Sequence, residues 1–203
     1  MAVSLKKGQR VDLRKNDGET LKNVTVGLGW DVIVPPKKGG FLGIFASQPA
    51  PPDIDCDASV LLCKEGKVKD NSDVVYYRNR KHKSGAIYHM GDNLTGAGDG
   101  DDEQINVKLM DIPAEYDKLV FVVNIFKAQE RNQHFGMIQN CFIRIIDNDT
   151  RVELCRFDLS ENYSGQTAMI FGEVYRKDGG WKFNAIGQGT TDDSLMQLVQ
   201  RFS

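Results

Sequence analysis

The sequence predicts an all-β protein, an antiparallel β-sandwich with a short C-terminal helix and a proline-rich inserted loop. Short segments rich in β-branched and aromatic residues recur along the 203 residues and alternate with turn-forming residues, which is typical of sandwiches. Helical periodicity is almost confined to the C-terminal end. The prolines are concentrated in one segment, so the other segments remain suitable for the interior of a sheet.

The expected strands are short and follow one another closely. They are residues 24–30, 59–63, 74–77, 86–89, 105–109, 119–126, 141–146, 154–159, 167–175 and 181–186. Residues 119–126 are apolar on both faces, which indicates a central strand. Asp178-Gly179-Gly180 favours a tight turn, so the last two strands should form a hairpin. Residues 193–202 have helical spacing with Asp192 or Asp193 as the cap, and residues 127–135 could add one turn.

One segment differs from the rest in composition. Five of the six prolines lie between Pro35 and Pro52, and proline cannot donate a hydrogen bond within a sheet. We therefore expect a single domain over residues 1–203 with residues 33–52 as an inserted surface loop. Its apolar centre, residues 41–45, could pack onto the sandwich or dock onto a partner or a membrane surface, and the sequence leaves both open.

Charge and hydropathy exclude several classes of protein. There are 26 basic and 28 acidic residues, which gives a net charge of -2. Proteins that bind nucleic acids through their phosphates are usually basic, so this class is disfavoured. No apolar segment is long enough to span a membrane, and the N-terminus has no apolar core of secretory length. The four cysteines, Cys56, Cys63, Cys141 and Cys155, lack metal-binding spacing. We expect a cytoplasmic protein that keeps them as reduced core residues.

The most informative segment is the glycine-rich loop 91–103, which contains five acids and no base. Its acids are Asp92, Asp99, Asp101, Asp102 and Glu103. Carboxylates crowded into one loop repel one another, and a hard cation bound through oxygen relieves that repulsion. Glycine lets the backbone curl so that carbonyl groups can also point inward. The loop does not match an EF-hand, because Leu94 and Gly96 stand where that motif needs oxygen ligands.

A second group of carboxylates could complete a cation site. Asp55 and Asp57 lead into an expected strand, so side-chain alternation places both on one face. Asp31 ends another expected strand and is a donor of the same kind. An all-oxygen set favours calcium over zinc, copper or nickel, and the single His89 before the loop fits a structural role. From the residues alone, a solvated acidic loop and turn remain the alternative.

A basic run precedes the acidic loop and consists of Arg78, Arg80, Lys81 and Lys83. It could bind an anion, a nucleotide or an acidic partner, or form a solvated hairpin face. The sequence contains no Gly-x-Ser-x-Gly motif and no Walker loop. We therefore expect no enzymatic activity.

Several motifs, in order along nearly the whole chain, resemble those of the TerD family of tellurium-resistance and stress-response proteins. They are VTVGLGWD (24–31), DCDAS (55–59), HMGDNLTG (89–96), GDDE (100–103), DLSE (158–161), TAM (167–169), GE (172–173) and WKF (181–183). Cys56 stands where the family often has leucine, but both aspartates are kept. The long insert is more like TerZ-type members and the C-terminal third more like TerD-type ones, so the subgroup stays open.

The resemblance implies a cytoplasmic, non-catalytic β-sandwich that binds two calcium ions and serves tellurite and chemical-stress resistance as a sensor or adaptor. It also implies partners, namely related Ter-type subunits and an integral membrane protein of the TerC type, so that the protein could form oligomers or lie at the inner membrane face through that partner. The implied ligands are Asp31, Asp55, Asp57, Asp92, Asn93, Asp102 and Glu103, a backbone carbonyl of Gly98 or Gly100, and Asp101. Some relatives are described as cAMP-binding, so a small-anion or cyclic-nucleotide module is the alternative function.

Overall fold

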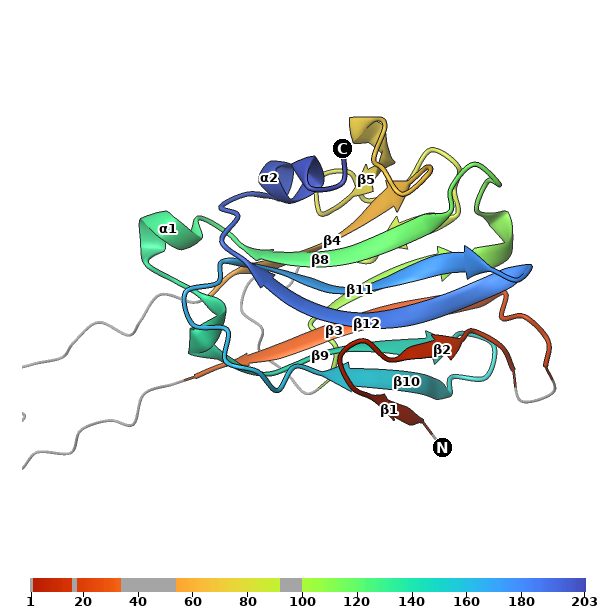
Figure 1. The fold of residues 1–203 in the computed structure, drawn as a ribbon, viewed down its shortest axis with the longest axis horizontal. Helices are drawn as coiled ribbons and strands as arrows, with labels where there is room; N and C mark the ends of the chain where they lie inside the picture. Colours follow the sequence, from red (N-terminus) through yellow and green to blue (C-terminus); the bar gives the residue numbers. More distant parts are fainter. Residues whose placement is uncertain (1, 16–17, 34–53, 92–99) are drawn as a thin grey trace, which may run out of the picture.

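The computed structural model describes residues 2–15, 18–33, 54–91 and 100–203. They form two six-stranded sheets packed face to face (Figure 1), which confirms the predicted β-sandwich. The proline-rich insert from residue 34 onward, including its apolar centre, lies outside the described residues. So do the predicted ligands Asp92, Asn93 and Gly98.

The first sheet has the strand order β1-β10-β9-β3-β7-β6 and the second has the order β2-β12-β11-β8-β4-β5. The strands of the first are β1 (Val3–Leu5), β10 (Glu153–Asp158), β9 (Ile138–Asp147), β3 (Asn23–Val32), β7 (Glu103–Lys108) and β6 (Ile87–His89). Those of the second are β2 (Arg10–Asp12), β12 (Gly180–Thr190), β11 (Ala168–Lys177), β8 (Lys118–Ile125), β4 (Cys56–Cys63) and β5 (Val74–Val75). Short helices connect them: η1 (Asn71–Asp73), η2 (Leu109–Asp111), α1 (Ala128–Arg131), η3 (Phe135–Met137) and α2 (Leu195–Gln200).

Strand β8 is central and covered on both faces, as its apolar sequence predicts. Phe121 belongs to the core between the two sheets. Val120 and Val122 point the other way and pack with Leu198 and Val199 of α2, which lies on the outer face of the second sheet (Figure 1). Both faces of this sheet therefore bury apolar side chains, which accounts for a run without alternation.

The predicted helices are confirmed at 195–200 and, as one turn, at 128–131. The predicted cap is wrong: Ser194, not Asp192 or Asp193, caps α2 by accepting a hydrogen bond from the amide of Gln197. Asp192 instead forms an ion pair with Arg201. Among the described residues, no helix has the length and apolar character that a membrane span requires.

The last two strands form the predicted hairpin, with Lys177 opposite Gly180. Asp178 and Gly179 between them have φ angles of 53° and 74°. Two successive residues with positive φ give a turn whose twist matches the strands, which is why an Asp-Gly pair favours it.

The sequence patterns miss the two N-terminal strands, each only three residues long. β1 pairs with β10 in parallel, and β2 pairs with β12 in the other sheet. Among the described strands, β1 and β10 are therefore the one parallel pair, at an edge of an otherwise antiparallel sheet. Three residues are too few to show alternation, and the partners lie far away in the sequence.

Candidate metal centre

Carboxylates from separate segments meet where β3 ends and where β4 and β7 begin. Leu28 of β3 pairs with Glu103 of β7. The carbonyl of Leu28 accepts a hydrogen bond from the amide of Asp102, and the amide of Trp30 donates to the Asp102 carboxylate at 2.7 Å. These bonds hold the end of the acidic loop along β3, directly beside Asp31.

Asp31 and Asp102 form the first carboxylate pair. Burial raises the pKa of Asp102, and the negative charges of Asp31 and Asp101 raise it further. One Asp31 oxygen accepts a hydrogen bond of 2.7 Å from the side-chain amide of Asn140. Burial, together with the charges of Asp31 and Asp102, raises the pKa of Cys141 to about 12. This pair is therefore a half-buried, mutually repelling set of oxygen donors.

Asp55, Asp57 and Glu103 all lie near Cys56, although the three are not clustered as they would be around a metal ion. Burial raises the pKa of the Cys56 thiol, and the neighbouring charges of these three acids add to the effect. Asp57 is 7% exposed and Glu103 is 2% exposed. Asp55 precedes β4, which begins at Cys56.

Glu103 also links the two sheets. Its Oε2 accepts a hydrogen bond of 2.6 Å from the amide of Ala58 in β4. His89 lies next to this link, with its Nε2 3.1 Å from the Ala58 carbonyl oxygen and 3.4 Å from Glu103 Oε2. These contacts agree with the structural role expected for His89, and they fix one Glu103 oxygen within the protein.

Asp101 has a different environment from the other acids. Its side chain is fully buried and accepts a hydrogen bond of 2.7 Å from Nε of Arg144. The same guanidinium contacts Glu153 at 3.1 Å. Because Arg144 neutralises this carboxylate, Asp101 is a poorer candidate for a metal ligand than the neighbouring acids.

Two glycines of β3 make room for this acidic segment. A Cβ atom on Gly27 would overlap the Asp101 carboxylate, and one on Gly29 would overlap the ring of Phe142 and approach the carbonyl oxygen of Gly100. The two glycines of the Gly-Leu-Gly sequence in β3 therefore leave the space that residues 100–101 occupy. The sequence patterns missed this role, although alternate glycines inside a strand are a signal for close approach.

The described residues alone do not form a complete metal site. Within residues 2–15, 18–33, 54–91 and 100–203, no three histidine, cysteine, aspartate or glutamate side chains are clustered as for a metal ion. The donors that do meet are oxygens that repel one another, and this chemistry suits a hard cation. Asp92, Asn93 and Gly98 come between β6 and β7 in the sequence and lie outside the described residues.

The basic run is spread over separate local contacts. Arg80 donates to the backbone carbonyls of His89 and Met90, at 3.2 and 2.7 Å. Arg78 lies over the ring of Tyr77, and Lys83 forms an ion pair of 2.8 Å with Asp73. Arg80 and Lys83 thus make contacts within the protein, and the contacts of residues 78–83 do not gather the four charges around one anion.

A buried polar network was not anticipated from the sequence. The Asp73 side chain is fully buried and accepts a hydrogen bond of 2.7 Å from the hydroxyl of Tyr116. His82 Nε2 lies 3.3 Å from the same carboxylate, and its Nδ1 is 2.7 Å from the hydroxyl of Ser84. Only the fold reveals it, because Tyr116 is distant from Asp73 in the chain.

The fold and the site define a class of protein, a two-sheet β-sandwich whose strands β3, β4 and β7 carry carboxylates at one end. The profile of the TerD domain matches residues 1–202. The chain belongs to the TerD family of tellurium-resistance and stress-response proteins, as the sequence motifs indicated.

Individual relatives span nearly the same length. The chain is 47% identical to the stress response protein SCP2 of Bacillus subtilis (strain 168), over 100% of both chains. It is 46% identical to the tellurium resistance protein TerD of Serratia marcescens, over 93% of this chain and 91% of that one. Proteins of Serratia marcescens named TerX and TerZ match as well.

A solved structure has the same fold. It is a homologue of the telluride resistance protein TerD from Streptomyces coelicolor A3(2), with a TM-score of 0.64 and 21% identity. The match covers 90% of this chain and 98% of that chain.

Proposed function

We propose that this protein is a non-catalytic, calcium-binding stress-response protein of the cytoplasm. Its acidic end binds two calcium ions, and the bound ions order a surface that partners recognise. The single observation that carries the proposal is that carboxylates of separate segments lie at the end where the acidic loop joins β7, with Asp31 beside Asp102, and with Asp55, Asp57 and Glu103 near Cys56.

The physical argument is electrostatic. Burial and like charges already raise the pKa of Asp102, so ionising all these acids together is unfavourable without a counter-charge. A divalent cation supplies that charge and accepts oxygen ligands in a flexible geometry. Asp92, Asn93 and a carbonyl of Gly98 or Gly100 would complete the coordination. Two separate groups are compatible with two ions.

Bound calcium would have two effects: it would stabilise the folded chain, and it would neutralise negative charge at the acidic end. Binding to the folded chain adds the binding free energy to stability. It also removes negative charge from one end of the molecule, so a partner surface there differs between the loaded and the empty protein. Related TerD-family subunits and an integral membrane protein of the TerC type are the partners we propose. The alternative of an anion or cyclic-nucleotide module has less support, because Arg80 and Lys83 make internal contacts.

The test is calcium titration by calorimetry of metal-stripped protein, with magnesium as the comparison ion. Asp57→Asn should lower calcium affinity while the metal-free sandwich stays folded, as checked by circular dichroism. A ligand at 100 times its dissociation constant stabilises by about 2.7 kcal/mol, so thermal unfolding gives an independent reading. Absence of calcium binding to the wild-type chain would refute the proposal.

A further inference from the structure

A cavity of about 280 Å³ lies on the outer face of the second sheet, separate from the core between the sheets. Beneath α2 this face is apolar, with Leu61 of β4 and Val122 of β8. Toward the start of β4 it becomes polar, and the cavity is floored by Asp57 and Ser59 of β4 and by Asn124 of β8. The strand register places Asp57 directly opposite Asn124.

The floor contains buried polar atoms without partners. Ser59 is 0% exposed and Asn124 is 6% exposed. The hydroxyl of Ser59 and the side-chain carbonyl oxygen of Asn124 have no hydrogen-bond partner among the described residues. Leaving such atoms unsatisfied is costly, and native proteins rarely do so without a reason. A ligand that donates hydrogen bonds would satisfy them.

The charged side chains around the cavity favour a ligand of positive charge. Asp57, Glu130 and Asp193 contribute three carboxylates, against the single ammonium group of Lys127. That ammonium group is already paired with Glu130 at 3.0 Å. An anion would meet net repulsion and acceptor atoms, whereas a cationic donor would meet attraction and acceptor atoms.

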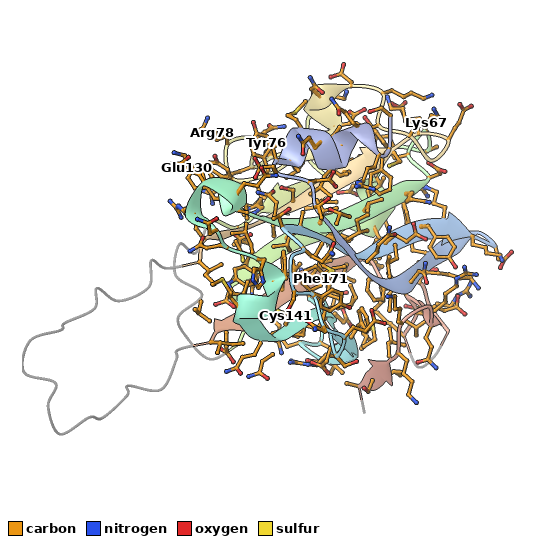
Figure 2. The ribbon with its side chains drawn as sticks, turned by 60° about the vertical axis from the view of Figure 1, so that its left-hand side comes forward. Lys67, Tyr76, Arg78, Glu130, Cys141 and Phe171 are labelled. Atoms are coloured by element: carbon orange, nitrogen blue, oxygen red, sulfur yellow. The ribbon has the colours of Figure 1, made fainter. Side chains whose placement is uncertain are left out.

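Aromatic rings form the wall. Tyr76 and Tyr77 line the cavity and stand edge to face, with ring centroids 5.5 Å apart. Figure 2 shows Tyr76 and Glu130 on the same side of the molecule, with Arg78 near them and Cys141 well away. The guanidinium of Arg78 already lies over the Tyr77 ring, 5.3 Å from its centroid. Aromatic faces of this kind attract ammonium and guanidinium groups.

From these features we infer that the cavity bounded by Asp57, Ser59, Asn124 and Tyr76 is a binding site for an organic cation, an alkyl ammonium or guanidinium group. Such a group donates several hydrogen bonds at once, which suits the Asn124 carbonyl and the Ser59 hydroxyl. It carries the charge that the carboxylates select. The cavity has room for the end of an alkylamine or an arginine side chain, and both sources share this chemistry.

The test is calorimetric titration of the full chain with agmatine, putrescine and a short neutral peptide containing one arginine. Acetate and phosphate serve as anionic controls. Each titration is run on calcium-loaded and on metal-stripped protein, because Asp57 borders both this cavity and the proposed metal centre. We expect saturable binding of the cations and none of the anions. Tighter binding of the peptide than of agmatine identifies a partner side chain as the source, and the reverse order identifies a free amine.

Two variants test the floor, and two further variants test the charge. Ser59→Ala and Asn124→Leu should weaken agmatine binding roughly tenfold or more, the range for one hydrogen bond to a charged group. Both should leave the free protein at least as thermally stable, because each removes an unsatisfied buried atom. Glu130→Gln should weaken binding, whereas Glu161→Gln, which removes another exposed carboxylate that is paired with a lysine, should not.

Three results would overturn the inference. One is the absence of binding by every cation in both metal states, which would leave water as the occupant. The second is equal affinity of wild type, Ser59→Ala and Asn124→Leu for agmatine. The third is a loss of calcium binding in Asn124→Leu, which would make the cavity part of the metal centre.

Discussion

Arg144 of β9 donates a hydrogen bond of 2.7 Å to Asp101, a carboxylate whose side chain is fully buried beside the strand β3. The guanidinium is about one quarter exposed and also reaches Glu153. A buried charge that keeps its partner is tolerated, but one that loses its partner is strongly unfavourable. The pair therefore fixes the end of the acidic loop on the first sheet.

Replacing Arg144 tests this relationship. Arg144→Met should destabilise the protein by about 2–3 kcal/mol, less than the loss of a fully buried pair because the guanidinium is partly exposed. Chemical denaturation gives the value. Adding Asp101→Asn to that variant should restore part of the loss, since the unpaired charge is gone. Purely additive effects of the two substitutions would contradict the pairing.

Gly27→Ala should destabilise the protein by about 1–3 kcal/mol, the range for overpacking a well-filled site. The added methyl group would overlap the Asp101 carboxylate. Gly180→Ala is the matched control, because its Cβ would lie 3.4 Å from the flexible side chain of Arg14. The free energy of unfolding of both variants is measured in urea. Equal destabilisation by the two substitutions would show that the space beside Gly27 is unimportant.

Comparing Asp102→Asn with Asp101→Asn should distinguish a metal ligand, Asp102, from a structural carboxylate, Asp101. Asp102 has a raised pKa from burial and neighbouring charges, so neutralising it should stabilise the metal-free protein and weaken calcium binding. Asp101→Asn should leave calcium affinity nearly unchanged, because Arg144 occupies that carboxylate. Thermal unfolding and calorimetry read the two effects, and a similar loss of affinity in both variants would count against the assignment.

Acid should weaken the Asp73 network. Burial lowers the pKa of His82, although Asp73 opposes this. The folded state then binds protons less readily than the unfolded one, whose histidine titrates at about 6.5. This stability is present above that pH and falls as the pH drops through it. We expect the melting temperature of His82→Gln to depend less on pH between about 7.5 and 5 than that of wild type. Parallel curves would contradict the prediction.

The thiols should react slowly. All four cysteines are buried and free, and burial raises the pKa values of Cys63 and Cys155 to about 12. Since the thiolate is the reactive form, a disulfide reagent should modify the native protein at neutral pH far more slowly than the denatured one. Rapid modification of the native protein would contradict this prediction, because it would show that at least one buried cysteine becomes accessible.

Local patterns predicted the parts of the fold that depend on local sequence. The double-faced apolar run of β8 and the Asp-Gly turn after β11 both carry their own signals, and both are confirmed. β1 and β2 were missed because their partners are distant and the strands are too short for a pattern. The cap of α2 was misplaced because Asp192, Asp193 and Ser194 are all suitable caps, and packing chooses among them.

The site was predictable as a set of residue types, but not as an arrangement. Asp101 and Asp102 are adjacent in the sequence, yet Asp101 is paired with Arg144 whereas Asp102 lies beside Asp31. Both residues precede β7, and only the placement of this segment along β3 gives them different neighbours. Ser59 and Asn124 carried no signal at all, because a polar residue without a partner is recognisable only when the packing around it is known.

The N-terminal strands set a constraint on how the chain is made. Val3 pairs with Cys155, and Val11 pairs with Phe183. During synthesis, β1 and β2 must therefore wait until the much later strands β10 and β12 have been made before either finds its neighbour. Until then the backbone groups of β1 and β2 have no strand to pair with, so both segments are open to wrong pairing. Trimming the N-terminus would open two edges at once.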